Sequence, residues 1–221
     1  GELPVAGVHA PWAALGIEVR GRSRLLRVNY RTSHQIRSRA DRLLDPEVSD
    51  PDGLTDRRDT TISVFGGPAP EVRLFPDSDA EIAAVAEWLK SRAEAGIAPR
   101  EIGVFVRSEA QVQRARGAMA HAGFAAAPMF APTPSQDDAI TLATMHLAKG
   151  LEFRAVAVMA CNDDAIPSLE RIEQIGDEAD LEEVYTTERN LLYVACTRAR
   201  EALLVTGVEA GSEFVEDLGG S

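Results

Sequence analysis

Three short segments of the sequence combine residue types that could bind a nucleotide or a phosphate. The first is Leu26–Thr32, in which Arg31 follows a short apolar run and precedes a predicted helix. Ligands of α/β proteins bind where strands end, and the fixed charge and forked donors of an arginine suit a phosphate. A surface arginine in an ion pair is the alternative that this segment alone leaves open.

The second segment, residues 141–153, places five such residues between two predicted strands: Thr144, His146, Lys149, Gly150 and Glu152. The hydroxyl, the imidazole and the ammonium could contact a backbone phosphate, and glycine allows close backbone approach. The glutamate could accept hydrogen bonds from a ribose hydroxyl pair. An ordinary capped loop is the competing interpretation. The segment is not a Walker A loop, because G-x-x-x-x-G-K-[ST] occurs nowhere in the chain.

The third segment, Glu188–Arg200, is a predicted helix that carries several arginines near its C-terminal end. Cations there complement the helix dipole, which is sufficient to explain Arg198 without any ligand. Glu188, however, falls on the inward stripe between Val184 and Leu191. A carboxylate on that face requires a partner, and we expect a nearby basic residue to supply it.

Taken together, the three segments resemble the motifs of the second RecA-like domain (2A) of UvrD/Rep/PcrA-type superfamily 1 DNA helicases. Asn29–Arg31 matches motif IV, N-Y-R-S/T, and Thr144–Phe153 matches motif V, T-x-H-x-A-K-G-L-E-F. Glu188–Ala199 matches motif VI, E-R-x-L-L-Y-V-A-x-T-R-A. The three motifs occur in the family's order.

The resemblance implies half of an ATPase site. Arg31 and Arg198 would be the catalytic arginines that reach the γ-phosphate of ATP, and Glu152 would bond the ribose. Neither a Walker A loop nor a D-E-x-x run precedes motif IV. ATP and its Mg²⁺ would therefore be held by an upstream RecA-like domain, and we expect no metal site in this chain.

The resemblance also implies a single-stranded DNA contact. Thr144 and His146 would face the DNA, and Lys149 and Gly150 would shape the same loop. The implied function is the C-terminal motor domain of an ATP-dependent DNA helicase or translocase with 3′–5′ polarity, as used in DNA repair. A non-catalytic RecA-like interaction module and the motor part of a helicase–nuclease are the alternatives.

The resemblance sets the expected domain boundaries. It covers roughly residues 23–207, which leaves 1–22 as a lead-in segment and 208–221 as a tail. Larger members of the family insert an accessory domain (2B) before motif V, where this chain has only a proline-rich stretch at 128–138. A natural compact form and an engineered deletion would both produce this spacing. Because Gly1 replaces an initiator Met, we expect a segment of a longer protein.

Apolar runs and helical periodicity alternate along the chain, which predicts an α/β fold: a RecA-like parallel sheet flanked by helices, of the P-loop NTPase type but without its own Walker A. Residues 45–61 are predicted to be a loop, and residues 162–179 a polar, acidic connection. The expected strands are Leu25–Val28, Glu71–Phe75, Ile102–Val106, 124–130, Ile140–Ala143, Ala155–Ala160 and Ala202–Thr206, and the expected helices are 33–44, 79–95, 109–122 and 180–199.

Composition limits the classes of function. The 221 residues are 45% hydrophobic and 26% charged, as in ordinary globular proteins, and no apolar run is long enough to cross a membrane. The net charge of −12 excludes a chain that grips nucleic acid over its whole surface, so any DNA contact must be local. Cys161 and Cys196 are read as buried thiols, which suits a cytoplasmic protein.

Overall fold

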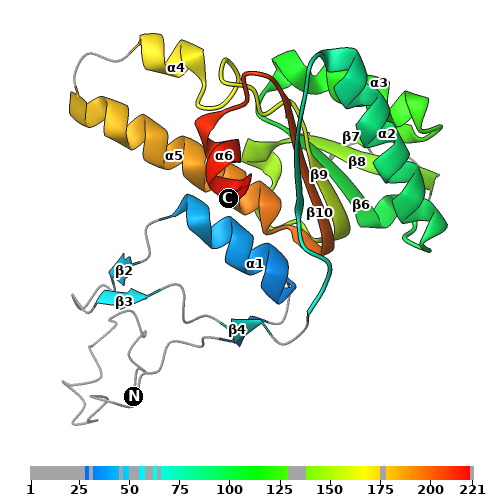
Figure 1. Ribbon diagram of the computed structural model, residues 1–221, viewed down its shortest axis with the longest axis horizontal. Helices are drawn as coiled ribbons and strands as arrows, with labels where there is room; N and C mark the ends of the chain where they lie inside the picture. The colour runs from blue at the N-terminus through cyan, green and yellow to red at the C-terminus, as the bar shows by residue number, and fades with distance from the viewer. Residues whose placement is uncertain are drawn as a thin grey trace, which may run out of the picture.

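A six-stranded, all-parallel sheet forms the centre of the molecule (Figure 1). The computed structural model describes residues 28–29, 32–44, 47–49, 55–57, 62–63, 66–128, 138–174 and 178–219. The strand order is β5-β10-β9-β6-β8-β7. The strands are β5 (Glu71–Phe75), β6 (Ile102–Val106), β7 (Ala125–Pro128), β8 (Ala139–Thr144), β9 (Phe153–Val158) and β10 (Ala199–Val208).

Helices cover both faces of this sheet (Figure 1). On one face lie α1 (His34–Ala40), α5 (Glu178–Cys196) and α6 (Glu213–Gly219), and on the other lie α2 (Ser78–Glu94) and α3 (Val112–His121). All five residues of β6 are buried, as expected for a central strand covered on both faces. The predicted α/β fold with a parallel, helix-flanked sheet is therefore confirmed.

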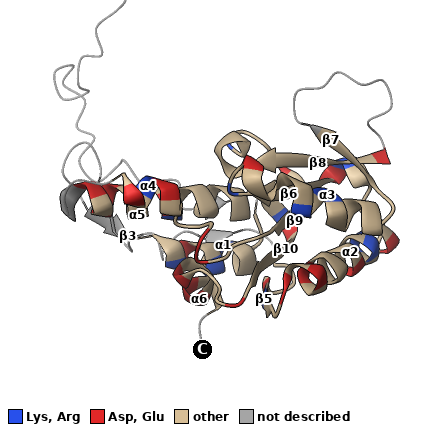
Figure 2. Cartoon of the chain, turned by 90° about the horizontal axis from the view of Figure 1, so that it is seen from above, with Lys and Arg blue, Asp and Glu red and all other residues tan. Residues whose placement is uncertain are grey.

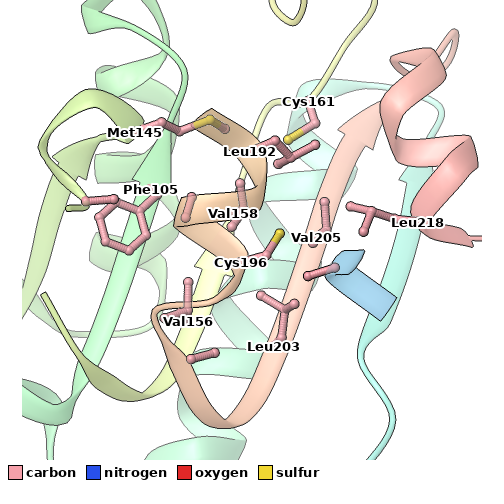
Figure 3. Close-up of a cluster of buried hydrophobic side chains, with 14 of the residues drawn as sticks. Phe105, Met145, Val156, Val158, Cys161, Leu192, Cys196, Leu203, Val205 and Leu218 are labelled. Atoms are coloured by element: carbon pink, nitrogen blue, oxygen red, sulfur yellow. The ribbon is translucent and has the colours of Figure 1, made fainter. Parts of the chain in front are cut away.

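The larger of the two apolar cores fills the space between the sheet and α5. Figure 3 shows Leu192 and Cys196 of α5 above the β9 residues Val156 and Val158, with Leu203 of β10 beside them. These five side chains are at most 3% exposed. The core fixes α5 against the strands, and α5 carries the residues of the third motif.

Several local predictions need correction. Of the predicted strand Leu25–Val28, the structure describes only Val28, which begins β1 (Val28–Asn29). This short strand pairs with β4 (Ile62–Ser63) and does not belong to the main sheet. The predicted loop 45–61 contains an antiparallel pair, β2 (Glu47–Ser49) and β3 (Thr55–Arg57). The connection 162–179 contains the short helix α4 (Leu169–Glu173).

The predicted tail, residues 208–221, contains the end of a strand and a helix. β10 continues to Val208, and Phe214, Val215 and Leu218 of α6 are buried in the same core as α5. The domain boundaries as such stay a prediction. Within the described residues, no helix is both long and apolar enough to cross a membrane. Acidic positions are prominent along α2 and α5 (Figure 2), in keeping with the net charge of −12.

Candidate functional site

The candidate residues divide between the two opposite edges of the sheet. Glu152 immediately precedes β9 and Arg198 immediately precedes β10, so both lie at the amino edge. The two strands pair with Phe153 opposite Ala199, and the Phe153 amide donates to the Arg198 carbonyl over 3.0 Å. Ligands of α/β proteins usually bind where strands end, but Glu152 and Arg198 meet where two strands begin. They meet there because β9 and β10 are parallel and start side by side.

A polar pocket of about 310 Å³ lies at this amino edge. It combines Thr32, at the S/T position of motif IV, with residues of motifs V and VI, and motif IV lies more than a hundred positions before motif V. The lining residues are Thr32, Arg37, Gly150, Leu151, Glu152, Tyr193, Thr197 and Arg198. Arg31, which the sequence predicted to be a second arginine of the site, lies outside the described residues, and its role stays a prediction.

Arg198 sits in the two-residue turn between α5 and β10, rather than inside the helix as predicted. Its Nε donates to the Val194 carbonyl over 3.0 Å, and its Nη2 donates to the Thr197 hydroxyl over 3.3 Å. A third bond, from Nη1 to the Leu151 carbonyl, measures 3.4 Å. The guanidinium therefore complements the C-terminal end of α5 and lines the pocket at the same time.

The end of α5 is also joined to the first motif. The Thr32 hydroxyl donates to the Thr197 carbonyl over 3.2 Å, and the Thr32 side chain is buried. Arg37 of α1 lies over the Tyr193 ring, with its Cζ 5.4 Å from the ring centroid, and its Nε is 2.9 Å from Asp41. These contacts hold α1 against α5 on one side of the pocket.

Glu152 and Gly150 form the other side of the pocket. The Glu152 carboxylate is 3.5 Å from Nε of Arg200, and both side chains are nearly half exposed, at 43% and 45%. Gly150 has a φ of 84°, a left-handed backbone conformation that residues other than glycine adopt only with strain. The backbone thus favours glycine at this position, in addition to the close approach inferred from the sequence.

The chemistry of this pocket suits part of a nucleotide. Guanidinium groups and hydroxyls can donate to phosphate oxygens, and a half-exposed carboxylate can accept from ribose hydroxyls. The residues present do not include a phosphate-binding loop of the Walker A type. Among the described residues there is likewise no cluster of three or more potential metal-binding side chains. The donors and the carboxylate of the pocket therefore match the phosphate and ribose groups of a nucleotide.

Thr144 and His146 of motif V lie at the carboxyl edge, about 20 Å from the start of β9 across its six residues, whereas Lys149 directly precedes Gly150 of the pocket. His146 and Lys149 are exposed in the connection between β8 and β9, whereas Thr144, at the end of β8, is only 9% exposed. The structure thus places His146 and Lys149 at the surface and most of Thr144 inside.

A buried ionic network lies directly beneath His146. The Glu188 carboxylate is fully buried and accepts two bonds of 2.6 Å from Nε and Nη2 of Arg107, whose side chain is 6% exposed. Arg171 of α4 adds a bond of 2.9 Å, and the Ser168 amide adds one of 3.3 Å. The remaining Nη1 of Arg107 lies 3.0 Å from Nε2 of His146.

The network shifts two pKa values. Burial alone would raise the pKa of Glu188, but the hydrogen bonds and charge of Arg107, with Arg171 and the Ser168 amide, lower it below its ordinary value. Burial lowers the pKa of His146, and the charges of Arg107 and Arg171 lower it further against the opposing effect of Glu188. Glu188 is therefore ionised and His146 neutral near pH 7.

Sequence reasoning expected a basic partner for Glu188 but did not identify it. Arg107 follows β6 directly, and β6 pairs with β8 so that Val106 lies opposite Thr144. The same rule that singled out Arg31, an arginine just past a strand, would have selected Arg107. Arg171 could not be found in this way, because residues 162–179 were interpreted only as a polar, acidic connection and the helix α4 was not predicted.

The comparisons with known proteins agree with the assignment of motifs V and VI. Residues 131–210 match the family model of the UvrD-like helicase C-terminal domain. The ATP-dependent DNA helicase PcrA of Staphylococcus aureus (strain MRSA252) is 41% identical over 70 residues, which are 32% of this chain and 9% of the relative. The putative ATP-dependent DNA helicase YjcD of Bacillus subtilis (strain 168) is 45% identical over 75 residues, which are 33% of this chain and 9% of the relative.

A solved structure shares the fold over nearly the whole chain. It is the C-terminal domain of a possible DNA helicase from Lactobacillus plantarum, with a TM-score of 0.59 and 21% identity, and the match covers 86% of this chain and 94% of the other. Residues 131–210, which contain motifs V and VI, are thus similar to a UvrD-like helicase C-terminal domain. The matched region is only about a tenth of the length of these curated relatives.

Proposed function

We propose that this chain is the second RecA-like domain of an ATP-dependent DNA helicase and completes an ATP site whose phosphate-binding loop belongs to another RecA-like domain. The pocket at the amino edge of β9 and β10 carries this proposal, because it gathers residues of motifs IV, V and VI on one surface. The family match over residues 131–210 supports it independently.

In this proposal Arg198 acts on the phosphates of ATP. Bound ATP would supply the bond that is hydrolysed, and its Mg²⁺ would be held by the other domain. Arg198 would place a fixed positive charge against the negative charge that develops on the transferred phosphoryl group. Glu152 would accept hydrogen bonds from the ribose and thereby orient the nucleotide. Arg31 would add a second guanidinium.

Helix α5 provides a rigid link between the nucleotide and the proposed DNA surface. Its end supports Arg198, while Glu188, about 15 Å earlier along the helix, anchors Arg107 beneath His146. Closure of the two RecA-like domains on ATP would move both ends of α5 as one body. The loop after β8 would follow, which converts closure and opening into movement along DNA in the proposed 3′–5′ direction.

The proposed DNA contact is small and local. His146 and Lys149 are exposed, and Arg171 adds a partly exposed guanidinium close to His146. Thr144 and Gly150 would shape the loop. With a net charge of −12, the chain should bind single-stranded DNA weakly and with a shallow dependence on salt, because few phosphates are neutralised. Tight binding with a steep salt slope would contradict this placement.

ATP hydrolysis by the isolated 221 residues tests the half-site proposal. We expect a folded chain without measurable DNA-stimulated turnover, because the phosphate-binding loop is absent from the sequence. ATP analogue binding, measured by calorimetry, should be weak and weaker still in an Arg198→Ala variant. Turnover by the isolated chain would refute the half-site. Analogue binding that is unaffected by Arg198→Ala would remove this pocket from the ATP site.

A further inference from the structure

We infer that Arg107 is a positioning residue that holds His146 as a neutral imidazole with its proton on Nδ1, so that the loop after β8 presents an uncharged hydrogen-bond donor to DNA. The inference rests on the proposed function only where it concerns DNA. The state of the imidazole follows from the geometry of the network alone.

The first step concerns the hydrogen bond between the two side chains. Nη1 of Arg107 lies 3.0 Å from Nε2 of His146. A guanidinium carries only donors and remains charged in proteins, so it cannot accept a hydrogen bond from the ring. Nε2 must therefore be the acceptor and carry no proton. A neutral imidazole keeps one proton, which must then reside on Nδ1.

The second step concerns the orientation of Arg107. Its guanidinium could turn away from His146 if its other nitrogens were unrestrained. Nε and Nη2 instead form paired bonds of 2.6 Å to the two oxygens of Glu188, which is fully buried. This fork fixes the plane of the guanidinium and leaves Nη1 directed at the ring. Glu188 thus positions Arg107, and Arg107 positions His146.

The third step concerns the charges around the ring. Arg107 at the end of β6 and Arg171 of α4 disfavour a second positive charge on His146, and Glu188 of α5 partly offsets them. Lys149, in the same connection, is exposed and cationic. Protonation of His146 would also break its bond to Arg107 and place two cations 3.0 Å apart. The neutral form is therefore favoured by geometry and by charge together.

The neutral His146 and the cationic side chains would therefore have different roles at the proposed DNA surface. Lys149 and Arg171 would supply charge, whereas His146 would donate one directed hydrogen bond from Nδ1 to a phosphate or base oxygen. A neutral donor holds DNA less tightly than a cation would, which suits a loop that must release its contact at every step. It also makes the contribution of His146 to binding insensitive to pH near neutrality.

Nuclear magnetic resonance of the ¹⁵N-histidine-labelled chain tests the inference without DNA. Long-range ¹H–¹⁵N spectra report which ring nitrogen is protonated, and a His146→Gln variant identifies the resonances. We expect the Nδ1–H form at pH 7 and a titration midpoint below the ordinary value of about 6.5. A ring protonated on Nε2, or a doubly protonated ring at pH 7, would overturn the inference. This measurement needs no substitution of Arg107 or Glu188.

Two variants then separate positioning from folding. Arg107→Lys keeps the charge beside Glu188 but loses the fork, so the Nδ1–H preference should be lost and the midpoint should rise. Arg171→Ala is the matched control, because it removes a cation that does not touch the ring, and the Nδ1–H form should persist. Circular dichroism verifies folding. An unchanged tautomer in folded Arg107→Lys would show that Arg107 does not position the ring.

Binding of a labelled oligonucleotide at pH 6 and pH 8 completes the test. In Arg107→Lys, protonation of His146 should strengthen binding at pH 6 relative to pH 8 by more than in the wild-type chain. An equal pH dependence in the two proteins would contradict the role of the neutral donor. If neither protein bound DNA while the Nδ1–H form was observed, the DNA role would fail and the positioning of His146 by Arg107 would stand.

Discussion

Replacing Glu188 by glutamine should destabilise the domain strongly. The substitution keeps the size of the side chain but removes the charge that four donors share, from Arg107, Arg171 and Ser168. An amide has one acceptor oxygen, so at least one bond of the fork is lost. Arg107, whose side chain is only 6% exposed, is left as a nearly buried cation without a counterion.

The cost of such a change is large relative to the stability of a domain. Removing one partner of a buried ion pair typically costs about 3–5 kcal/mol. A domain of this size has roughly 5–15 kcal/mol in total. With a urea dependence of about 2 kcal/mol per molar, the unfolding midpoint should fall by roughly 2 M.

The assay is equilibrium unfolding in urea, followed by circular dichroism and by tryptophan fluorescence. Trp88 of α2 is 5% exposed and should report the loss of the core. The matched control is Asp217→Asn, which removes a 2.7 Å ion pair with Arg189 whose side chains are 42% and 31% exposed. Exposed pairs contribute about 0–1 kcal/mol, so the control should change little. A Glu188→Gln variant no less stable than this control would refute the reasoning.

Three other predictions follow from the same structure. The folded-state pKa of Glu188 is lowered, so the ionised carboxylate stabilises the fold fully above the ordinary carboxyl pKa of about 4.3. This stabilisation is lost as the pH falls through the lower folded-state pKa. Urea midpoints between pH 6 and pH 3 should therefore fall less steeply in Glu188→Gln than in wild type. Burial raises the pKa of Cys196 to about 12 and raises that of Cys161 as well, so neither thiol should react with a thiol reagent until urea unfolds the chain, and rapid labelling of the native protein would show that the core is open. Gly150→Ala should cost about 1 kcal/mol through its φ of 84° alone, since a Cβ would meet no atom within 4 Å, and an unchanged urea midpoint would mean that the backbone relaxes.

The sequence predicted individual strands better than their arrangement. The apolar run Ala155–Ala160 indicated a strand buried on both faces, and β9 occupies Phe153–Val158 in the middle of the sheet. The order of the strands depends on which apolar faces pack together across long sequence separations, and no local pattern encodes it. The pair β2–β3 was missed because its two strands have three residues each and lie in a polar, proline- and glycine-rich stretch.

The sequence predicted some residues of the candidate site but not which residues contact one another. Glu152 and Arg198 could be named from motifs, and the structure places them in one pocket. The pocket lies at the amino edge of the sheet because the register of β9 and β10 brings the starts of these strands together. Arg107 was missed because its partner Glu188 lies 81 positions away, where only the folded chain can reveal the contact.

The central claim is that the pocket containing Arg198 is half of an ATP site. The most direct test is steady-state ATP hydrolysis with the chain joined to a RecA-like domain that carries a phosphate-binding loop. Arg198→Ala should reduce kcat by roughly 10³-fold and change the KM for ATP little, because the contact is realised mainly in the transition state. Arg154→Ala is the control, since Arg154 lies at the same edge of the sheet but is bound to Glu201 over 2.8 Å, outside this pocket. Near-normal turnover in Arg198→Ala would mean that Arg198 serves only the end of α5, and the account of the pocket would be wrong.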